Sequence, residues 1–396
     1  MMAAISAAER GASVMLLEPN ERLGKKLNIT GKGRCNVTNN TGLEEIMANI
    51  PRNGKFLYSS FSRFNAQDTM AFFEELGVPL KTERGNRVFP VSDSAFDISA
   101  ALERRLKKLR VQILRDRAKS LKVESGAVTG VMGESRYYPA ETVILATGGV
   151  SYPATGSTGE GHRIAEAAGH TVTLLRGSLV PLRDFGVGKV LQGLSLRNVG
   201  LTVFEDSKRI YQDFGELVFT HFGVSGPLVL SASAHMRRFG ERAYHLEIDL
   251  KPALDEQRLD RRLLGDFEKY SNYDFCNSLN DLLPKKLIPE IVRVSGITAR
   301  QKVHDITREQ RRGLVQVLKH FPIAIAGPCT VTDAIITSGG VKVKEIDPAT
   351  MGSRLVRGLY FAGEIIDVDA YTGGFNLQIA WSTGRAAGIA AAGEDG

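Results

Sequence analysis

The first eighteen residues constrain the fold more than any other part of the chain. Residues 2–10 are rich in alanine and predict a helix, and Gly11 stands where such a helix would end. Residues 13–17 (SVMLL) form a short apolar run that leads directly into Glu18. A helix, a short turn, a buried strand and an acidic residue, in this order, are typical of the second half of a βαβ unit that binds a dinucleotide.

The first half of such a unit would be a strand followed by G-x-G-x-x-G, and neither occurs ahead of Met1. We therefore expect the sequence to be N-terminally truncated, with Met1 an internal methionine of a longer gene product. A strand, the glycine turn and a short lead would add roughly 12–15 residues upstream.

The totals favour a soluble protein of more than one domain. A chain of 396 residues is too long for a single hydrophobic core. No apolar run approaches the roughly 20 residues that span a bilayer. The opening MMAAISAAERG lacks the basic residues that begin a signal peptide, and Glu9 and Arg10 interrupt it. We expect no membrane partner.

The cysteines indicate a reducing, cytoplasmic location. Cys35, Cys276 and Cys329 are odd in number and far apart, which argues against a disulfide framework. No pair has the spacing of metal ligands, and the seven histidines form no H-x-x-x-H arrangement. We expect no metal site.

The sequence pattern changes three times after residue 176. Residues 201–220 alternate apolar and polar side chains around a polar turn, as a hairpin does. Residues 254–320 are instead helical, and a strand-like pattern returns from Ile323. We expect a dinucleotide-binding domain built from both chain ends, 1–176 and 323–396. A β-rich domain at 177–252 and a helical insert at 253–322 would lie between them.

Two glycine-containing segments predict ligand loops in the first part of the chain. Gly31 and Gly33 permit close backbone approach, and Lys32 and Arg34 would suit a pyrophosphate or an electron-rich flavin edge. The alternative is a solvated basic loop. Residues 146–148 end a buried strand at its carboxyl edge, where open α/β sheets bind ligands. A polar loop at 151–159 follows, longer than a plain connection needs.

The C-terminal stretch GLYFAGEIIDVDAYTGGFNLQIAWSTGRAAG is the most specific segment. A strand ends at Gly363 and Glu364, and a carboxylate in that position can hold ribityl hydroxyls. The Gly373–Gly374 turn precedes a helix of small residues. Backbone amides at that helix N-terminus would favour the negative charge that gathers on reduced flavin.

Four segments together, TGKGRCNVTN, ATGGVSYPATGSTG, THFGVSGP and GLYFAGEIIDVDAYTGGFNLQIAWSTG, resemble the YhiN/BaiN-like family of FAD-dependent oxidoreductases, which includes aminoacetone-oxidase-like flavoproteins. The resemblance covers essentially the whole chain. It implies an α/β, Rossmann-type FAD-binding domain formed from both chain ends, with inserted β-barrel and helical domains. The candidate cofactor-binding residues are Glu18, Lys26, Gly31, Lys32, Gly33, Arg34, Cys35, Asn36, Ala146, Thr147, Gly148, Gly363, Glu364, Gly373, Gly374, Phe375, Asn376 and Leu377.

The resemblance also implies the class of reaction. We expect NAD(P)H to reduce FAD, which then passes a hydride to an unsaturated acceptor, or the oxidation of a small amine or carbonyl compound. The family includes proteins that reduce a uridine of ribosomal RNA to dihydrouridine, so ribosomal RNA and a small molecule both remain candidate substrates. Because the glycine fingerprint is absent, a flavin-less binding protein is a further alternative.

Acid–base residues are harder to find in this sequence. His221 and Tyr152 are the candidate catalytic residues, although a lone histidine is more often structural. Cys35 suits a buried, inert thiol better than a reactive one.

Clusters of basic residues raise the question of RNA binding. Arg104, Arg105 and Lys108 would share one helix face, in a chain whose net charge is +7. A solvated face is the usual explanation of such a run, and binding of RNA phosphates is the alternative.

Overall fold

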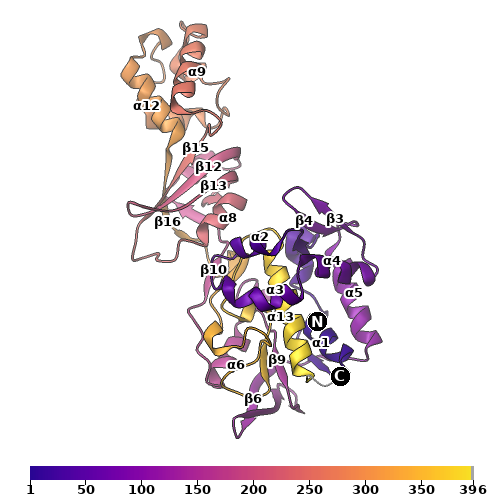
Figure 1. Ribbon diagram of the computed structural model, residues 1–396. Helices are drawn as coiled ribbons and strands as arrows, with labels where there is room; N and C mark the ends of the chain where they lie inside the picture. Colours follow the sequence, from indigo (N-terminus) through magenta and orange to yellow (C-terminus); the bar gives the residue numbers. More distant parts are fainter. Residues whose placement is uncertain (394–396) are drawn as a thin grey trace. The chain divides into compact units, whose positions relative to one another are not determined.

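The computed structural model describes residues 1–393 as two compact units, each considered by itself (Figure 1). Unit 1 contains Met1–Ser178 and the chain from Thr330 onward, and unit 2 contains Leu179–Cys329. Both chain ends therefore build unit 1, and the middle of the chain forms unit 2 as a single insertion.

Unit 1 contains two pairs of short parallel strands. β1 (Met15–Leu17) pairs with β5 (Gln112–Leu114), and β9 (Val143–Leu145) pairs with β18 (Leu359–Phe361). These strands are apolar, as expected where helices and other strands cover both faces of a parallel sheet. The residues that follow them include Glu18, Ala146 and Glu364, so candidate residues stand at carboxyl ends in both pairs.

Helix α1 (Met2–Glu9) packs directly on helix α13 (Phe375–Ala391), which joins the two ends of the chain. Small residues make this close approach possible. A Cβ atom on Gly388 would lie 2.3 Å from the carbonyl oxygen of Ala3. The alanines of α1 and the small residues of α13, which the sequence pattern could not pair, thus serve one helix–helix contact.

The other elements of unit 1 surround these strands and helices. β2–β4–β3 and β6–β7–β8 form three-stranded sheets, and β10 pairs with β17. Their bounds are β2 Thr38–Asn39, α2 Leu43–Ala48, α3 Tyr58–Arg63, α4 Ala66–Glu75, β3 Leu80–Glu83, β4 Arg87–Pro90, α5 Ala95–Lys108, β6 Ala118–Glu124, β7 Ala127–Gly133, β8 Tyr137–Pro139, α6 Glu160–Ala167, β10 Arg176–Ser178 and β17 Ile336–Ser338.

Unit 2 is a closed antiparallel barrel with helices. The strand order is β11-β14-β13-β12-β15-β16, and a single core cluster contains barrel residues such as Leu201 together with helix residues such as Leu314. The bounds are β11 Leu182–Asp184, α7 Val187–Leu191, β12 Ser195–Glu205, β13 Lys208–Phe219, β14 Gly223–Ser225, α8 Pro227–Ser233, β15 Tyr244–Asp249, α9 Glu256–Lys269, α10 Phe275–Ser278, α11 Ile288–Ser295, α12 Arg308–Lys319 and β16 Phe321–Pro328.

The structure differs from the expected boundaries in one respect. The β-rich and helical segments were expected as separate inserts, with the returning strand from 323 assigned to the closing segment. Strand β16 instead pairs with β15 and β11 and closes the barrel, so it belongs to unit 2. The reason is that a strand-like pattern does not reveal its pairing partner, and here hydrogen bonding to distant strands decides the unit.

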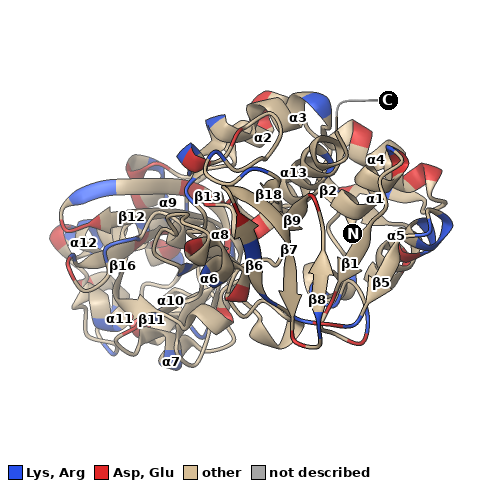
Figure 2. Cartoon of the chain, turned by 90° about the horizontal axis from the view of Figure 1, so that it is seen from below, with Lys and Arg blue, Asp and Glu red and all other residues tan. Residues whose placement is uncertain are grey.

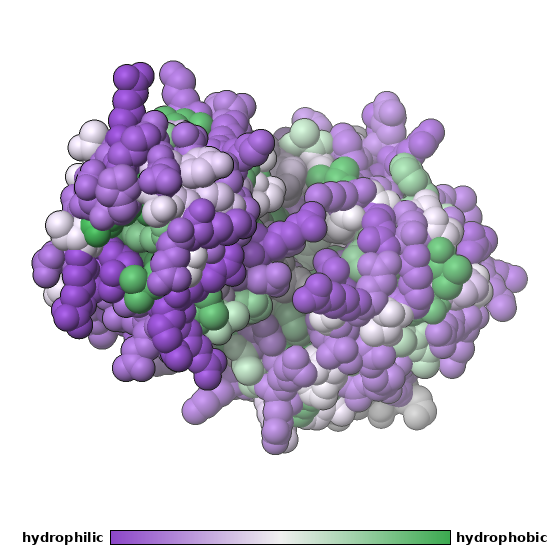
Figure 3. Space-filling view, turned by 90° about the horizontal axis from the view of Figure 1, so that it is seen from above, coloured by the Kyte–Doolittle hydropathy of each residue, from purple (hydrophilic) through white to green (hydrophobic). Residues whose placement is uncertain are grey.

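Polar side chains cover most of the face seen in Figure 3. Among residues 1–393, no helix combines the length and the apolar composition that crossing a membrane would require.

Candidate cofactor-binding site

Three distant segments meet around the ammonium group of Lys26. Its Nζ atom lies 2.6 Å from Oε2 of Glu364 and 3.0 Å from Oγ of Ser151. Ser151 Oγ also donates to the other carboxylate oxygen of Glu364, at 3.1 Å. Lys26 ahead of the 31–36 loop, Ser151 in the polar loop after β9 and Glu364 shortly after β18 therefore form one polar cluster, as expected where the carboxyl ends of several strands face one ligand site.

Thr337 positions Glu364 and the backbone of residues 150–151 in this cluster. Its backbone amide donates to Oε1 of Glu364 at 2.7 Å, and its hydroxyl oxygen accepts hydrogen bonds from the amides of Val150 and Ser151. The side chain is completely buried. Sequence reasoning missed Thr337, because a threonine in the middle of a three-residue strand has no distinguishing spacing. Its tertiary contacts alone reveal its position.

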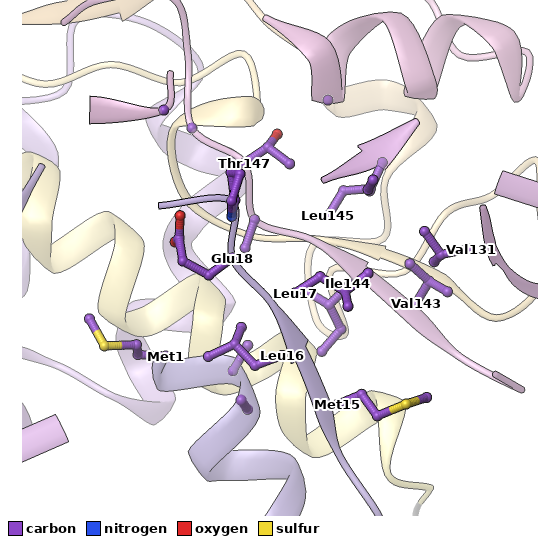
Figure 4. Close-up of a pocket in the computed structure, with 18 of the residues that line it drawn as sticks. Met1, Met15, Leu16, Leu17, Glu18, Val131, Val143, Ile144, Leu145 and Thr147 are labelled. Carbon is purple, nitrogen blue, oxygen red and sulfur yellow. The ribbon is translucent and has the colours of Figure 1, made fainter. Parts of the chain in front are cut away.

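Glu18 lies at the end of β1 and lines a cavity of ≈ 490 Å³ (Figure 4). This volume lies within the range of small-molecule sites. Its Oε1 atom accepts hydrogen bonds from the backbone amide and the side-chain amide of Asn20, and that side chain also donates to the carbonyl of Thr155. Of the other candidates, Lys26 and residues 146–148 line the same cavity. The remaining candidates lie outside its lining.

The 31–36 loop depends on left-handed backbone conformations. Gly31, Lys32, Gly33 and Cys35 all have positive φ angles, between 56° and 85°. At Gly31 a Cβ atom would lie 3.0 Å from the backbone nitrogen of Asn36. The loop is therefore held in a tight form that favours glycine at position 31, in agreement with the close backbone approach expected there.

Arg34 is held by two acidic residues of unit 1. Its NH2 atom lies 2.5 Å from Oε1 of Glu83 and 2.5 Å from Oδ1 of Asp93, and its guanidinium lies 4.1 Å from the ring centroid of Phe89. The hydrogen bonds to both carboxylates raise the pKa of Arg34. Lys32, by contrast, is exposed. Arg34 and Lys32, which the sequence pattern did not distinguish, thus have different surroundings.

Cys35 and Asn36, at the end of the 31–36 loop, both place side-chain atoms in the protein interior. Burial raises the pKa of the Cys35 thiol to about 12, so the nucleophilic thiolate is scarce at neutral pH. The side-chain oxygen of Asn36 is buried and has no hydrogen-bond partner among the described residues. Buried acceptors are normally paired, so this oxygen suits a donor supplied by a ligand.

The Gly373–Gly374 turn begins helix α13 directly beside β2. Gly374 has φ 102°, and a Cβ atom there would lie 2.5 Å from the carbonyl oxygen of Thr38. Thr38 donates in turn to Oε1 of Gln378, and Asn39 donates to the carbonyl of Gly373. As the residue that precedes α13, Gly374 offers no side-chain cap, which leaves the first amides of the helix for a ligand.

The residues after this turn differ in their burial and in their hydrogen bonds. Phe375 is buried in one hydrophobic core cluster, whereas Leu377 is partly buried and packs against a second cluster, which contains Trp381. The side chain of Asn376 accepts from the amide of Ala370 and donates to the carbonyls of Ala370 and Tyr371. The side chain of Asn376 is therefore used in hydrogen bonds to the preceding loop residues. Its backbone amide is the group that it can present to a cofactor. Gly363, with φ 74°, donates its amide to Thr383.

The two candidate catalytic residues belong to different units. Tyr152 follows Ser151 in unit 1, with an exposed side chain and a left-handed φ of 52°. His221 is exposed in the turn between β13 and β14 of unit 2, where its ring lies edge-on to Phe222. Histidine, cysteine and acidic side chains of the described residues form no group of three or more that could hold a metal ion.

Comparison with known proteins gives matches that cover almost the whole chain. The model of the HI0933-like protein Rossmann domain matches residues 1–390. A 3-dehydro-bile acid delta(4,6)-reductase of Clostridium scindens is 31% identical over 99% of this chain and 96% of its own length. A ribosomal RNA dihydrouridine synthase of Escherichia coli is 30% identical over 97% of this chain and 93% of its own length.

A similar fold occurs in a solved structure. A 3-ketosteroid-delta4-(5alpha)-dehydrogenase from Rhodococcus jostii, crystallised with 4-androstene-3,17-dione, covers 99% of this chain with a TM-score of 0.53 and 14% identity, and the match covers 94% of that structure. At this identity the likeness concerns the fold alone. Together with the family match, it confirms the predicted Rossmann-type α/β class.

Proposed function

The chain belongs to the HI0933-like Rossmann-domain family, as its motifs predicted, and from this premise we propose that it is an FAD-dependent reductase that takes electrons from NAD(P)H. Its acceptor would be a small molecule with a carbon–carbon double bond activated by a carbonyl group. FAD, when bound, accepts a hydride and passes it on. The protein therefore has to bind the cofactor, orient the acceptor beside it and supply a proton.

The observation that carries this proposal is the contact between Lys26, Ser151 and Glu364. Each belongs to a different segment assigned to the cofactor on sequence grounds, and they meet within 3.1 Å. The buried, unpartnered oxygen of Asn36 and the uncapped start of α13 add an acceptor and donors that fit a flavin. These are residues of unit 1 alone.

Each part of the site would have a distinct task. Glu18 would accept hydrogen bonds from adenosine ribose hydroxyls, and Glu364, steadied by Lys26 and Thr337, would hold ribityl hydroxyls. The amides that begin α13 would favour negative charge at the N1–C2=O side of the reduced ring. Tyr152, in unit 1, is the side chain that we propose as proton donor to the acceptor, and His221, in unit 2, is the alternative candidate.

The relatives support the choice of acceptor. One is named as a delta(4,6)-reductase and the other as a dihydrouridine synthase, and both names describe the addition of hydrogen to a carbon–carbon double bond. Reduction of an electron-poor double bond is the chemistry that the two have in common, although one substrate is a bile acid and the other an RNA.

Anaerobic reduction of the purified protein tests the proposal. Flavin absorbance in the blue should bleach on addition of NADH or NADPH and return when a cyclic enone is added, with one double bond reduced for each flavin reoxidised. Protein reconstituted with FAD that is bleached by dithionite but by neither nicotinamide would refute the donor assignment. Flavin that is reoxidised by oxygen but by no enone would refute the acceptor.

Ribosomal RNA is the second candidate substrate, favoured by the relatives named for dihydrouridine synthesis. The basic clusters support it less. Arg105 pairs with Glu9, Lys107 with Glu103 and Arg311 with Asp260. Figure 2 likewise shows acidic residues interspersed with basic ones on α5 and α12. Part of this positive charge is therefore balanced within the protein, which is why we place the small-molecule acceptor first.

A further inference from the structure

The segment that leads from β18 to the Gly373–Gly374 turn alternates acidic and apolar residues, and all of them are buried. Val368 and Ala370 are 3% and 1% exposed and belong to a hydrophobic core cluster of unit 1. Asp367 and Asp369, which alternate with them, are 3% and 0% exposed. Charged side chains are rarely buried unless they are paired, so each of these carboxylates should have donors that hold it.

Asp367 is held by the loop that follows α2. Its Oδ2 atom lies 2.6 Å from NH2 of Arg52, and the side-chain amide of Asn53 donates to the carbonyl oxygen of Asp367 at 2.6 Å. Both the carboxylate and the backbone of this residue are therefore bound. The first half of the segment is fixed within unit 1 by these contacts.

Asp369 is held by two strands. Its Oδ2 atom accepts a hydrogen bond from the hydroxyl of Ser178 at 2.9 Å, and its Oδ1 atom accepts one from the hydroxyl of Ser338 at 3.0 Å. Ser178 ends β10 and Ser338 ends β17, and these two strands pair antiparallel. A single carboxylate therefore joins both members of the strand pair to the segment that leads to the turn.

Strand β17 also contacts the predicted cofactor site at a second point. The amide of Thr337, the residue before Ser338, donates to Oε1 of Glu364 at 2.7 Å. The strand thus binds the 364–374 segment at its start, through Glu364, and nearer its end, through Asp369. The two ends of this segment carry the carboxylate predicted for the ribityl hydroxyls and the amides predicted for the flavin ring.

The backbone between Asp369 and the turn is also held. The side chain of Asn376 accepts from the amide of Ala370 and donates to the carbonyls of Ala370 and Tyr371. The amide of Tyr371 donates in turn to the carbonyl of Asn49. Because these contacts leave the backbone little freedom, a displacement of Asp369 would displace the amides that begin α13.

From these contacts we propose that Asp369 is a positioning residue for the flavin. By binding β10 and β17 together, its carboxylate sets where the amides of the Gly373–Gly374 turn stand relative to Glu364. The inference rests on the proposed FAD site and adds a property to it, since the pairing of β10 with β17 and the binding of FAD then support each other. By linkage, what Asp369 contributes to FAD affinity, bound FAD returns as stability of the strand pair.

Asp369→Asn tests the proposal, because it keeps the size of the side chain and exchanges one acceptor oxygen for a donor amide. FAD affinity, measured by titration of flavin fluorescence, should fall about tenfold. Asp266→Asn is the matched control. Asp266 is also buried, at 8% exposure, and it pairs with Arg262 in unit 2. This control should bind FAD as tightly as the parent does.

Hydrogen exchange with and without FAD gives a readout that a merely structural role would not move. Because the Thr337 amide bonds to Glu364, the residues of β10 whose amides bond to β17 are Arg176 and Ser178. Saturating FAD should slow exchange of these two amides about tenfold in the parent and less than about twofold in Asp369→Asn. A residue that only stabilised the fold would change exchange in both states and leave the effect of FAD the same.

Two serine variants keep the proposal falsifiable if circular dichroism shows that Asp369→Asn does not fold. Ser178→Ala and Ser338→Ala each remove one donor to the carboxylate, and each should lower FAD affinity about threefold, a part of the coupling. Adding either change to Asp369→Asn should cost less than the sum of the single effects, because residues that share one hydrogen-bond network are not additive.

The outcomes distinguish this inference from the proposed function. Weaker FAD binding in Asp369→Asn and in both serine variants, together with loss of the FAD-dependent protection of β10, supports the positioning role. FAD that binds the variants as tightly as the parent, leaves β10 unprotected in the parent or protects it equally in Asp369→Asn would overturn that role alone. FAD that fails to bind the parent would overturn the proposed function, and this inference with it.

Discussion

The ammonium of Lys26 and the carboxylate of Glu364 lie 2.6 Å apart, although 338 positions separate the two residues in the sequence. Their side chains are 25% and 20% exposed, so water screens the pair only in part. The ion pair connects the first and last thirds of the chain at the predicted cofactor site. It therefore links the folding of unit 1 to the shape of that site.

Glu364→Gln should weaken FAD retention by about tenfold or more, because an amide leaves Lys26 without its counter-charge and a ribityl hydroxyl with a weaker acceptor. The unfolding free energy should fall by about 1–2 kcal/mol, between the values for exposed and buried pairs. Flavin fluorescence and urea denaturation measure the two effects. In a double-mutant cycle with Lys26→Met, additive losses would show that the pair contributes nothing to either.

Gly374→Ala should cost about 2–4 kcal/mol of stability, since it combines a left-handed φ with a Cβ atom 2.5 Å from the carbonyl of Thr38. Gly77→Ala is the matched control. Gly77 also has positive φ, at 81°, but no neighbour stands within 4 Å of its Cβ position. Thermal unfolding of both variants separates backbone strain from the clash. Equal losses in the two variants would mean that the contact with Thr38 is unimportant.

Arg34→Ala should reduce FAD affinity more than Lys32→Ala does. Arg34 ties the 31–36 loop to Glu83 and Asp93, whereas Lys32 is exposed. Removal of Arg34 frees the loop and leaves Lys81 as the remaining common partner of Glu83 and Asp93. Flavin titration of both variants gives the comparison. A larger effect of Lys32→Ala would assign the loop's positive charge, rather than its anchoring, to cofactor binding.

Acid should destabilise the protein through two buried histidines, His162 and His170, and the partly buried His235. Burial lowers the pKa of His162, His170 and His235. The unfolded state therefore binds more protons than the folded state below about pH 6.5, and stability falls as pH decreases through that value. Each such histidine adds a slope of up to about 1.4 kcal/mol per pH unit. Urea denaturation between pH 7.5 and 5.5 should show a smaller slope for His162→Gln than for the parent.

RNA binding, if it occurs through α5, should be sensitive to salt, because each neutralised phosphate releases counterions. Arg104→Glu, Arg105→Glu and Lys108→Glu together should then lower affinity for ribosomal RNA fragments and flatten the dependence on salt. Filter binding at several salt concentrations measures both. Affinity that ignores salt and these substitutions would leave the small-molecule acceptor as the remaining candidate.

Local patterns in the sequence predicted much of unit 1. The alanine-rich helix, the SVMLL strand and the glycine turn before α13 have signals that lie within a few residues of each other, and the structure contains each of them. Leu102 and Leu106 are buried on α5, on the side away from the exposed Arg104 and Lys108. The family motifs added the Rossmann class and the barrel, which no single segment specifies.

Tertiary pairing explains what the sequence could not supply. Thr337 reaches Glu364 and the 150–151 amides only after two loops fold together. Arg34 was predicted to bind the cofactor, but the sequence did not reveal that two acidic residues from later segments bind its guanidinium. Strand β16 was assigned to the wrong unit, because barrel closure depends on partners far along the chain. In each case the contact joins residues that lie far apart in the sequence, so no short motif indicates it.

The ends of unit 2 leave and rejoin unit 1 at neighbouring points. β10, just before the insertion, pairs antiparallel with β17, just after it, and the amide of Cys329 donates to the carbonyl of Pro181. An insertion whose two ends are adjacent can be lengthened, shortened or exchanged without moving the strands that surround the cofactor residues. The middle of the chain can therefore vary as a single module, while the two chain ends keep the fold of unit 1.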